Sequence, residues 1–385
     1  MTTPPPATVG MSLEQVDTPA LLLDLDAFEA NLQKLADEAR AAGIKLRPHA
    51  KTHKSPSVAL RQMALGAVGS CCQKVSEAEA MVNGGVPDVY ISNQVVGEVK
   101  YNRLAALATR ARISTCVDDR VQAEGLNAAA GRFGVVLDVL VEVDVGAARC
   151  GVAPGAPVAE LAALVAGLPH LRFGGLQAYQ GAAQHKRTPE ERGAAIAECV
   201  RRVQESQAAL AAAGLDCPLV TGAGTGTYPL EIASGVYGEL QAGSYAFMDA
   251  DYAKNRDAAG GQALAFAHSL FVYTTLMSRT RDDQAIVDAG LKALSVDSGM
   301  PWVQNLEGGG QAGGTLAGGV EYLKASDEHG TLRLTSPQPH LQVGRKLMLI
   351  PGHCDPTINL YDWYVCIRKG RVEALWPISA RGMLW

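Results

Sequence analysis

The amino-acid sequence predicts an α/β protein: a (β/α)8 barrel of the TIM type over residues 20–262, followed by a second, mostly β domain over residues 263–385. From residue 20 onward, apolar runs of strand length alternate about eight times with segments of helical periodicity, which is typical of a parallel sheet with helices outside. After about residue 263, strand-like segments follow one another without long helices. Residues 1–19 are expected to join the second domain. An open, doubly wound sheet is the alternative to the barrel.

In the first domain, strands are expected at residues 20–25, 45–50, 68–73, 88–93, 113–118, 135–145, 171–180 and 217–224. Helices are expected at residues 26–43, 55–67, 76–85 and 97–111, up to about 130, and at 157–168 and about 188–213. Gly43 stops the first helix, while Ser55 and Pro56 have the residue types of an N-cap and a first helical position.

In the second domain, strands are expected within residues 269–280, 284–290, 347–353 and 363–376. The segment EGGGQAGGTLAGG (307–319) is rich in glycine and predicts a flexible loop.

Composition excludes several function classes. The chain has 385 residues, 48% of them hydrophobic, which allows a large core, and its net charge of −5 with scattered basic residues argues against nucleic-acid binding. The start, MTTPPPATVG, lacks the pattern of a secretory signal, and no apolar run reaches the roughly 20 residues of a membrane span. Eight cysteines without a CxxC pair indicate reduced thiols and a cytoplasmic protein.

The segment LRPHAKTHKSP (46–56) is unusually dense in cations. On a strand, Arg47, His49 and Lys51 would share one face, because side chains alternate with period two. Neighbouring cations would lower the pKa of Lys51 from its usual value of about 10.4 and make the amine nucleophilic. The alternative is a solvated basic turn.

Polar residues follow the expected strands where a barrel carries its reactive groups, at the C-terminal rim. They are Lys51, Gln73, Arg149, Tyr179 with His185, and the segment TGAGTGT (221–227). We therefore expect one active site at this rim.

The glycine-rich segment 221–227 predicts a phosphate site, because glycines let backbone N–H groups approach a ligand and Thr225 adds a hydroxyl. Gly243 and Ser244 offer a second set of donors. The alternatives are a tight turn and a bend where the barrel closes. A lysine facing a phosphate site indicates a Schiff-base lysine and pyridoxal 5′-phosphate.

The segment PGHCDPT (351–357) places His353 and Asp355 two residues apart, on one side of an extended segment, with Cys354 pointing away. Imidazole and carboxylate ligands suit Mg²⁺ or Mn²⁺, and a capped turn is the alternative. Asp327 and His329 in SDEHG are either supporting groups for this site or part of a solvated turn.

The chain resembles the fold-type III pyridoxal phosphate enzymes, the alanine racemase-like barrels, and within them the D-threonine aldolase, 3-hydroxy-D-aspartate aldolase and D-serine dehydratase group. The motifs that carry the resemblance are DTPALLLDLDAFEANL (17–32), RPHAKTHKSP (47–56), CCQKVSEAEA (71–80), EVDVGAARCGV (142–152), LQAYQGAAQH (176–185), GAGTGT (222–227), ELQAGSYAFMDADY (239–252), SDEHG (326–330) and PGHCDPT (351–357).

The resemblance implies a role for each matching residue. Lys51 matches the lysine that carries the cofactor, and His185 matches a histidine at the substrate hydroxyl. Arg149 matches an arginine near the pyridine nitrogen. The other implied cofactor contacts are Gln73, Tyr179, Thr225, Gly243, Ser244 and Tyr252, and the implied metal ligands are His353 and Asp355.

The implied activity is metal-assisted retro-aldol cleavage of a D-3-hydroxy amino acid, such as D-threonine to glycine and acetaldehyde, in a homodimer. A 3-hydroxy-D-aspartate aldolase, which releases glyoxylate, is the first alternative. A D-serine or 3-hydroxyaspartate dehydratase is the second, although the relatives of that type have a cysteine as second metal ligand where this chain has Asp355. A non-catalytic pyridoxal phosphate carrier would lack the second domain, and a racemase would need a second base that the sequence does not reveal.

Overall fold

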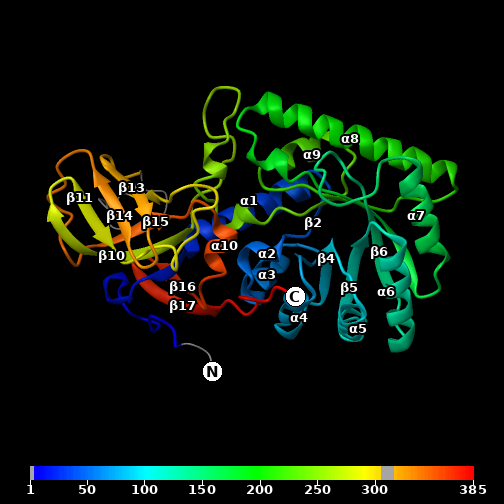
Figure 1. The fold of residues 1–385 in the computed structure, drawn as a ribbon, viewed down its shortest axis with the longest axis horizontal. Helices are drawn as coiled ribbons and strands as arrows, with labels where there is room; N and C mark the ends of the chain where they lie inside the picture. The colour runs from blue at the N-terminus through cyan, green and yellow to red at the C-terminus, as the bar shows by residue number, and fades with distance from the viewer. Residues whose placement is uncertain (1–3, 305–315) are drawn as a thin grey trace.

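The computed structural model describes residues 4–304 and 316–385 and contains two sheets (Figure 1). The first has eight parallel strands in the order β2-β9-β8-β7-β6-β5-β4-β3. A parallel bridge between His49, just after β2, and Cys71 in β3 joins the two ends of the sheet, which therefore curls round on itself. The predicted barrel with a second, mostly β domain is therefore confirmed.

The barrel strands are β2 (Lys45–Leu46), β3 (Ser70–Cys72), β4 (Asp88–Gln94), β5 (Arg112–Val117), β6 (Leu137–Glu142), β7 (Leu171–Ala178), β8 (Val220–Gly222) and β9 (Glu239–Leu240). The helices around them are α1 (Leu25–Ala41), α2 (Ala50–His53), α3 (Pro56–Ala64), α4 (Val75–Asn83), α5 (Glu98–Leu107), α6 (Arg120–Phe133), α7 (Ala156–Gly167), α8 (Pro189–Ala212) and α9 (Tyr228–Ser234). Apolar side chains of β3 to β8 and of the helices packed on them form one core, whereas those of α1, β2 and β9 belong to a second core that they share with the second domain.

One strand prediction was wrong. The segment at 20–25 was expected to open the barrel, but β1 (Ala20–Asp24) pairs antiparallel with β10 and parallel with β16 in the other sheet. Every residue of β1 is buried, so its apolar run reads like that of a barrel strand. The eighth barrel strand is β9, whose two residues are too few to show a pattern.

Because β1 is not a barrel strand and β9 is, the glycine-rich segment 221–227 follows the seventh barrel strand, β8, and not the eighth. Gly243 and Ser244 follow the eighth barrel strand, β9. Phosphate sites of (β/α)8 barrels lie at these two positions.

The second sheet has the order β13-β14-β11-β10-β1-β16-β17, with β15 pairing both β10 and β12. Its strands beside β1 are β10 (Leu270–Arg281), β11 (Gln284–Val287), β12 (Trp302–Val303), β13 (Val320–Ala325), β14 (Gly330–Leu334), β15 (Lys346–Ile350), β16 (Trp363–Arg368) and β17 (Arg371–Pro377). The four strand-bearing segments predicted here are confirmed, while residues 307–315 of the predicted glycine-rich loop lie outside the described residues.

The second domain sits against the rim of the barrel, where α10 (Cys354–Ile358) lies beside α2 (Figure 1). Phe247 contacts both domains. The centroid of its ring lies 6.0 Å from the ring centroid of Phe28 in α1 and 5.8 Å from that of Tyr364 in β16. The Tyr364 hydroxyl donates a 2.7 Å hydrogen bond to the carbonyl of His53 in α2. Strand β16 is thereby tied to the short helix that carries Lys51.

Within the described ranges, none of the helices combines the length and the apolar character needed to cross a bilayer. All eight cysteines lie in the described part of the chain, and each is a free thiol.

Candidate active site

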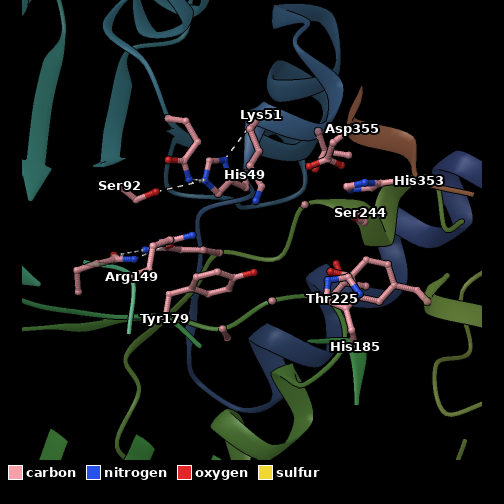
Figure 2. Close-up of a pocket in the computed structure, with 18 residues that line it drawn as sticks. His49, Lys51, Ser92, Arg149, Tyr179, His185, Thr225, Ser244, His353 and Asp355 are labelled. Atoms are coloured by element: carbon pink, nitrogen blue, oxygen red, sulfur yellow. Dashed lines mark hydrogen bonds between the residues drawn. The ribbon is translucent and has the colours of Figure 1, made fainter. Parts of the chain in front are cut away.

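A pocket of about 730 Å³, counted to its open mouth, lies at the C-terminal ends of the barrel strands and reaches the second domain (Figure 2). All the site residues that the sequence predicts line it: Lys51, Gln73, Arg149, Tyr179, His185, Thr225, Gly243, Ser244, Tyr252, His353 and Asp355. Their individual roles stay predictions. His49, which was expected beside Lys51, also lines it, and the lining further contains residues that were not predicted, among them Thr52, Ser92, Gln177 and Gln241.

Lys51 lies in the short helix α2 and not on a strand. Its Nζ atom is 6.0 Å from the centroid of the Tyr179 ring, and the guanidinium carbon of Arg149 is 5.9 Å from the same centroid. Burial lowers the pKa of the Lys51 amine, but Tyr179 and Asp355 favour its charged form, and the net shift is upward. The prediction that crowded cations lower this pKa was therefore wrong.

Arg47 explains part of that error, because it does not reach the pocket. Its guanidinium is buried between two carboxylates, with Nε 3.1 Å from Glu239 and one terminal nitrogen 2.6 Å from Asp88. It lines a separate cavity. His49 and Lys51 thus line the same pocket, whereas Arg47 is held away from it by Asp88 and Glu239.

His49 caps α2 from inside the barrel. Its Nδ1 accepts a hydrogen bond from the backbone N–H of Lys51 at 3.3 Å, and its Nε2 lies 3.2 Å from the Ser92 hydroxyl. Burial and the charge of Lys51 hold the pKa of His49 well below its ordinary value. His49 is therefore neutral, carries its proton on Nε2, which faces the Ser92 hydroxyl and the Gln73 side-chain amide at 2.9 Å, and anchors the backbone of Lys51.

The glycine-rich loops meet in the same pocket. The Thr225 hydroxyl accepts a hydrogen bond from the backbone N–H of Tyr245 at 3.0 Å, which joins the loop after β8 to the loop after β9. A Cβ atom on Gly243 would stand 2.6 Å from the Thr52 hydroxyl and 2.9 Å from the carbonyl oxygen of His49, so only glycine fits.

Pyridoxal phosphate fits these residues. The buried Thr52 hydroxyl has no hydrogen-bond partner among the described residues and would suit a phosphate oxygen near the glycine loops. Lys51 supplies an amine in the same pocket, and Arg149 a cation beside the ring of Tyr179.

His353 and Asp355 enter the pocket from the second domain. His353 is the extended residue that precedes α10, and Asp355 lies in the first turn of that helix, so the segment is only partly extended as predicted. Cys354 is buried, with its sulfur 3.7 Å from the carbonyl of Met248 and outside the pocket lining.

Carboxylates surround His353. Its Nδ1 is 2.8 Å from the carboxylate of Asp297, a contact typical of a histidine whose other nitrogen binds a metal. Burial lowers the pKa of His353, but Asp355 and Asp297 raise it, and the net shift is upward. Burial raises the pKa of nearby Asp249 to about 6. The Asp355 Oδ1 atom is buried without a hydrogen-bond partner in the described chain.

Across residues 4–304 and 316–385, no three histidines, cysteines or acidic residues are arranged to hold a metal ion together. The two predicted ligands therefore fit an ion that completes its shell with water or substrate, as Mg²⁺ commonly does. Asp327 and His329 are exposed, on the hairpin of β13 and β14, and do not line the pocket, which agrees with the solvated-turn alternative.

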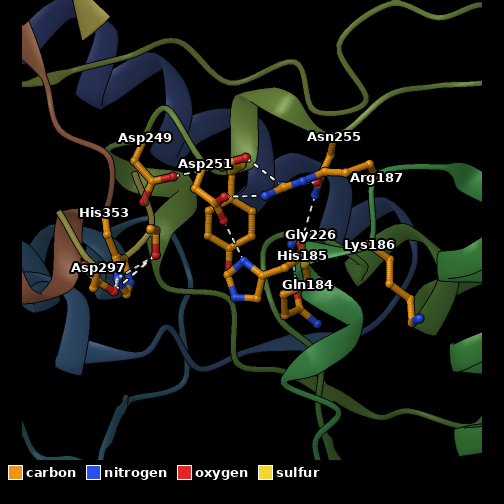
Figure 3. Close-up of polar contacts among 12 residues, drawn as sticks. Gln184, His185, Lys186, Arg187, Gly226, Asp249, Asp251, Asn255, Asp297 and His353 are labelled. Carbon is orange, nitrogen blue, oxygen red and sulfur yellow. Dashed lines mark hydrogen bonds and ion pairs between the residues drawn. The ribbon is translucent and has the colours of Figure 1, made fainter. Parts of the chain in front are cut away.

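His185 reaches the pocket from the loop that follows β7. Its Nδ1 lies 2.6 Å from the carboxylate of Asp251, and its ring lies 5.8 Å from that of Tyr252 (Figure 3). Asp251 belongs to the motif ELQAGSYAFMDADY (239–252), but no role for it was predicted.

A curled eight-stranded barrel with a lysine at its rim, glycine loops after the last two strands and a β domain over the rim defines an alanine racemase-like enzyme. The family model "Alanine racemase, N-terminal domain" matches residues 23–251, and a model of a serine dehydratase-type domain matches residues 269–367. The chain belongs to the alanine racemase N-terminal domain family, which confirms the predicted resemblance.

The chain is 47% identical over 381 residues to a 3-hydroxy-D-aspartate aldolase of Paracoccus denitrificans (strain Pd 1222), covering 98% of this chain and 95% of the relative. It is also 47% identical over 379 residues to a D-threonine aldolase of Arthrobacter sp., covering 98% and 96%. The crystal structure of D-threonine aldolase from Filomicrobium marinum superposes with a TM-score of 0.93 at 48% identity and covers all of both chains. These relatives are aldolases, in agreement with the predicted lyase class.

Proposed function

We propose that this protein is a pyridoxal phosphate- and divalent metal-dependent aldolase that cleaves D-3-hydroxy amino acids, with D-threonine and D-allo-threonine giving glycine and acetaldehyde. One observation carries the proposal: a single pocket joins Lys51 and His185 of the barrel to His353 and Asp355 of the second domain. The names of the relatives support the same reaction class.

Each side of the pocket has its part in binding the cofactor. Lys51 would hold it covalently between substrate molecules, and Arg149 would supply a cation for its pyridine nitrogen. Thr225, Gly243 and Ser244, which line the pocket, would bind its phosphate, and Gln73, Tyr179 and Tyr252 would supply further contacts. When bound, pyridoxal phosphate accepts the electron pair that is left on Cα when the Cα–Cβ bond breaks.

Bond cleavage requires a base at the β-hydroxyl of the substrate. The proton moves to His185, or to a water beside His353 and Asp355, while the hydroxyl oxygen forms the carbonyl of the aldehyde. Cα then takes up a proton and leaves as glycine. A positioned base typically contributes 10²- to 10⁴-fold to a rate.

The divalent ion would be held by His353 and Asp355 and would supply Lewis acidity at the β-hydroxyl. Nitrogen and oxygen ligands, with the Cys354 thiol outside the pocket lining, favour Mn²⁺ or Mg²⁺. An aspartate in the second ligand position is also what separates this proposal from a dehydratase.

A 3-hydroxy-D-aspartate aldolase is the second candidate, because relatives of that name and of D-threonine aldolase are 47% identical to the chain. We further propose a homodimer, following the resemblance, and a cytoplasmic location, which the eight free thiols support.

The test is a comparison of kcat/KM for D-threonine, D-allo-threonine and 3-hydroxy-D-aspartate with one enzyme preparation. We expect D-threonine and D-allo-threonine to be preferred and to release acetaldehyde. A higher kcat/KM for 3-hydroxy-D-aspartate with release of glyoxylate would favour the second candidate. Absence of aldehyde from all three would refute the proposed reaction, with Lys51→Ala as the inactive control.

A further inference from the structure

The carboxylate of Asp251 is the only described side chain within hydrogen-bond distance of the His185 ring, and its geometry is constrained. Its Oδ2 atom lies 2.6 Å from Nδ1 of His185, and the carboxylate is buried, whereas the side chain of His185 is 48% exposed at the pocket. One nitrogen of the imidazole is therefore held by Asp251 (Figure 3), while His185 lines the pocket where substrate would bind.

A second cation fixes the carboxylate itself. Arg187 forms an ion pair with Oδ1 of Asp251, and it also donates to the backbone carbonyl of Asp251 at 2.9 Å and to the Asn255 side chain at 2.7 Å. Burial raises the pKa of the Asp251 carboxyl, but His185 and Arg187 lower it, and the net shift is downward. Asp251 is thus ionised, with one oxygen committed to Arg187 and the other to His185.

These contacts determine the tautomer of His185. An ionised carboxylate accepts hydrogen bonds and donates none, so the ring must carry its proton on Nδ1. The Nε2 lone pair is then free to take a proton from a substrate in the pocket.

The segment that carries Asp251 also bonds the neighbours of the predicted metal ligands. The backbone N–H of Ala250 donates to the carbonyl of Pro351 at 3.0 Å, and Asp249 accepts a hydrogen bond from the backbone N–H of Cys354 at 3.1 Å. Residues 249–251 therefore contact the loop of His185 on one side and the segment of His353 on the other, although these belong to different domains.

We propose that Asp251 is a positioning residue that fixes the Nδ1-protonated tautomer of His185 and directs its Nε2 toward the substrate β-hydroxyl. The catalytic part of this inference rests on the proposed aldolase function, whereas the tautomer is a property of the protein alone.

The test is Asp251→Asn. Arg187 can only donate, so the introduced amide must turn its oxygen toward Arg187 and its NH₂ group toward His185. Nδ1 then has to accept, the ring proton moves to Nε2, and the base is blocked. We expect kcat to fall by about 10²- to 10⁴-fold, with little change in KM.

Asp257→Asn is the matched control, because Asp257 bonds only the backbone of its own exposed loop and lies outside the pocket. It should keep the wild-type kcat.

The readout besides activity is the ¹⁵N NMR spectrum of histidine-labelled holoenzyme, in which the His185 signals are assigned by their absence from His185→Gln. We expect a proton on Nδ1 in the wild type and on Nε2 in Asp251→Asn. A proton on Nε2 in the wild type would overturn the proposal even if the variant did not fold, and so would wild-type kcat in Asp251→Asn. If the tautomers are as expected but the wild type cleaves no D-3-hydroxy amino acid, the positioning role stands and the proposed function fails.

Discussion

Replacement of His353 by alanine is expected to abolish most aldolase turnover while the cofactor stays attached to Lys51. In the proposed function, His353 and Asp355 of the second domain would hold the metal ion at the pocket, and the substitution would leave Asp355 as the remaining proposed ligand. A Lewis acid is worth several kcal/mol at a developing alkoxide, so we expect kcat to fall by a factor on the order of 10² or more, which corresponds to about 2.7 kcal/mol.

The assay couples acetaldehyde release from D-threonine to NADH oxidation and records cofactor absorbance in the same sample. His329→Ala is the matched control, because this exposed histidine lies in the same domain but outside the pocket. Treatment of the wild type with a chelator should reproduce the loss, and Mn²⁺ or Mg²⁺ should restore the wild type but restore His353→Ala poorly. Full activity in chelator, with no metal in the protein, would show that PGHCDPT is only a turn.

Three further outcomes are expected. Borohydride should fix the cofactor on Lys51 and not on Lys54, because the Lys54 amine is buried in an ion pair with Glu77; a reduced peptide containing Lys54 would contradict the site. D-threonine and D-allo-threonine should both be cleaved and their L isomers should not, because one base and one metal approach Cα from one face; comparable turnover of L-threonine would refute this. Burial raises the pKa of Glu231 from 4.5 to about 7, so the folded state binds this proton more tightly than the unfolded state does. The contribution of Glu231 to the free energy of unfolding should therefore fall by about 3 kcal/mol as the pH rises from 4.5 to 7. Urea titrations at several pH values should show this decrease in the wild type but not in Glu231→Gln. An equal dependence of the free energy of unfolding on pH in both proteins would contradict the raised pKa of Glu231.

The barrel and the rim residues could be predicted because their signals are local. Alternating apolar and helical segments show the architecture, and Lys51, Gln73, Tyr179 and Thr225 each follow a barrel strand within a few residues. Strand β1 was misplaced because burial on both faces gives the same apolar run in either sheet, and β9 was missed because it has only two residues.

Contacts between distant residues could not be predicted. Arg47 is paired with Asp88 and Glu239, which are 41 and 192 residues away, and nothing in the segment 46–56 shows that these carboxylates remove its charge from the pocket. Asp251 likewise meets His185 across 66 residues. The sequence around Asp251 offers one sign of this contact, an acidic residue beside Tyr252 in MDADY. Acidic residues are common in turns, so this sign does not single out Asp251 as a partner of His185.

The most direct test of the account is the product stoichiometry from D-threonine. Purified holoenzyme with Mn²⁺ should release glycine and acetaldehyde in equal amounts, without ammonia, because the bond that breaks is Cα–Cβ. Formation of ammonia and a 2-oxo acid in place of glycine would mean that the β-hydroxyl leaves while Cα–Cβ stays intact, and it would contradict the central claim.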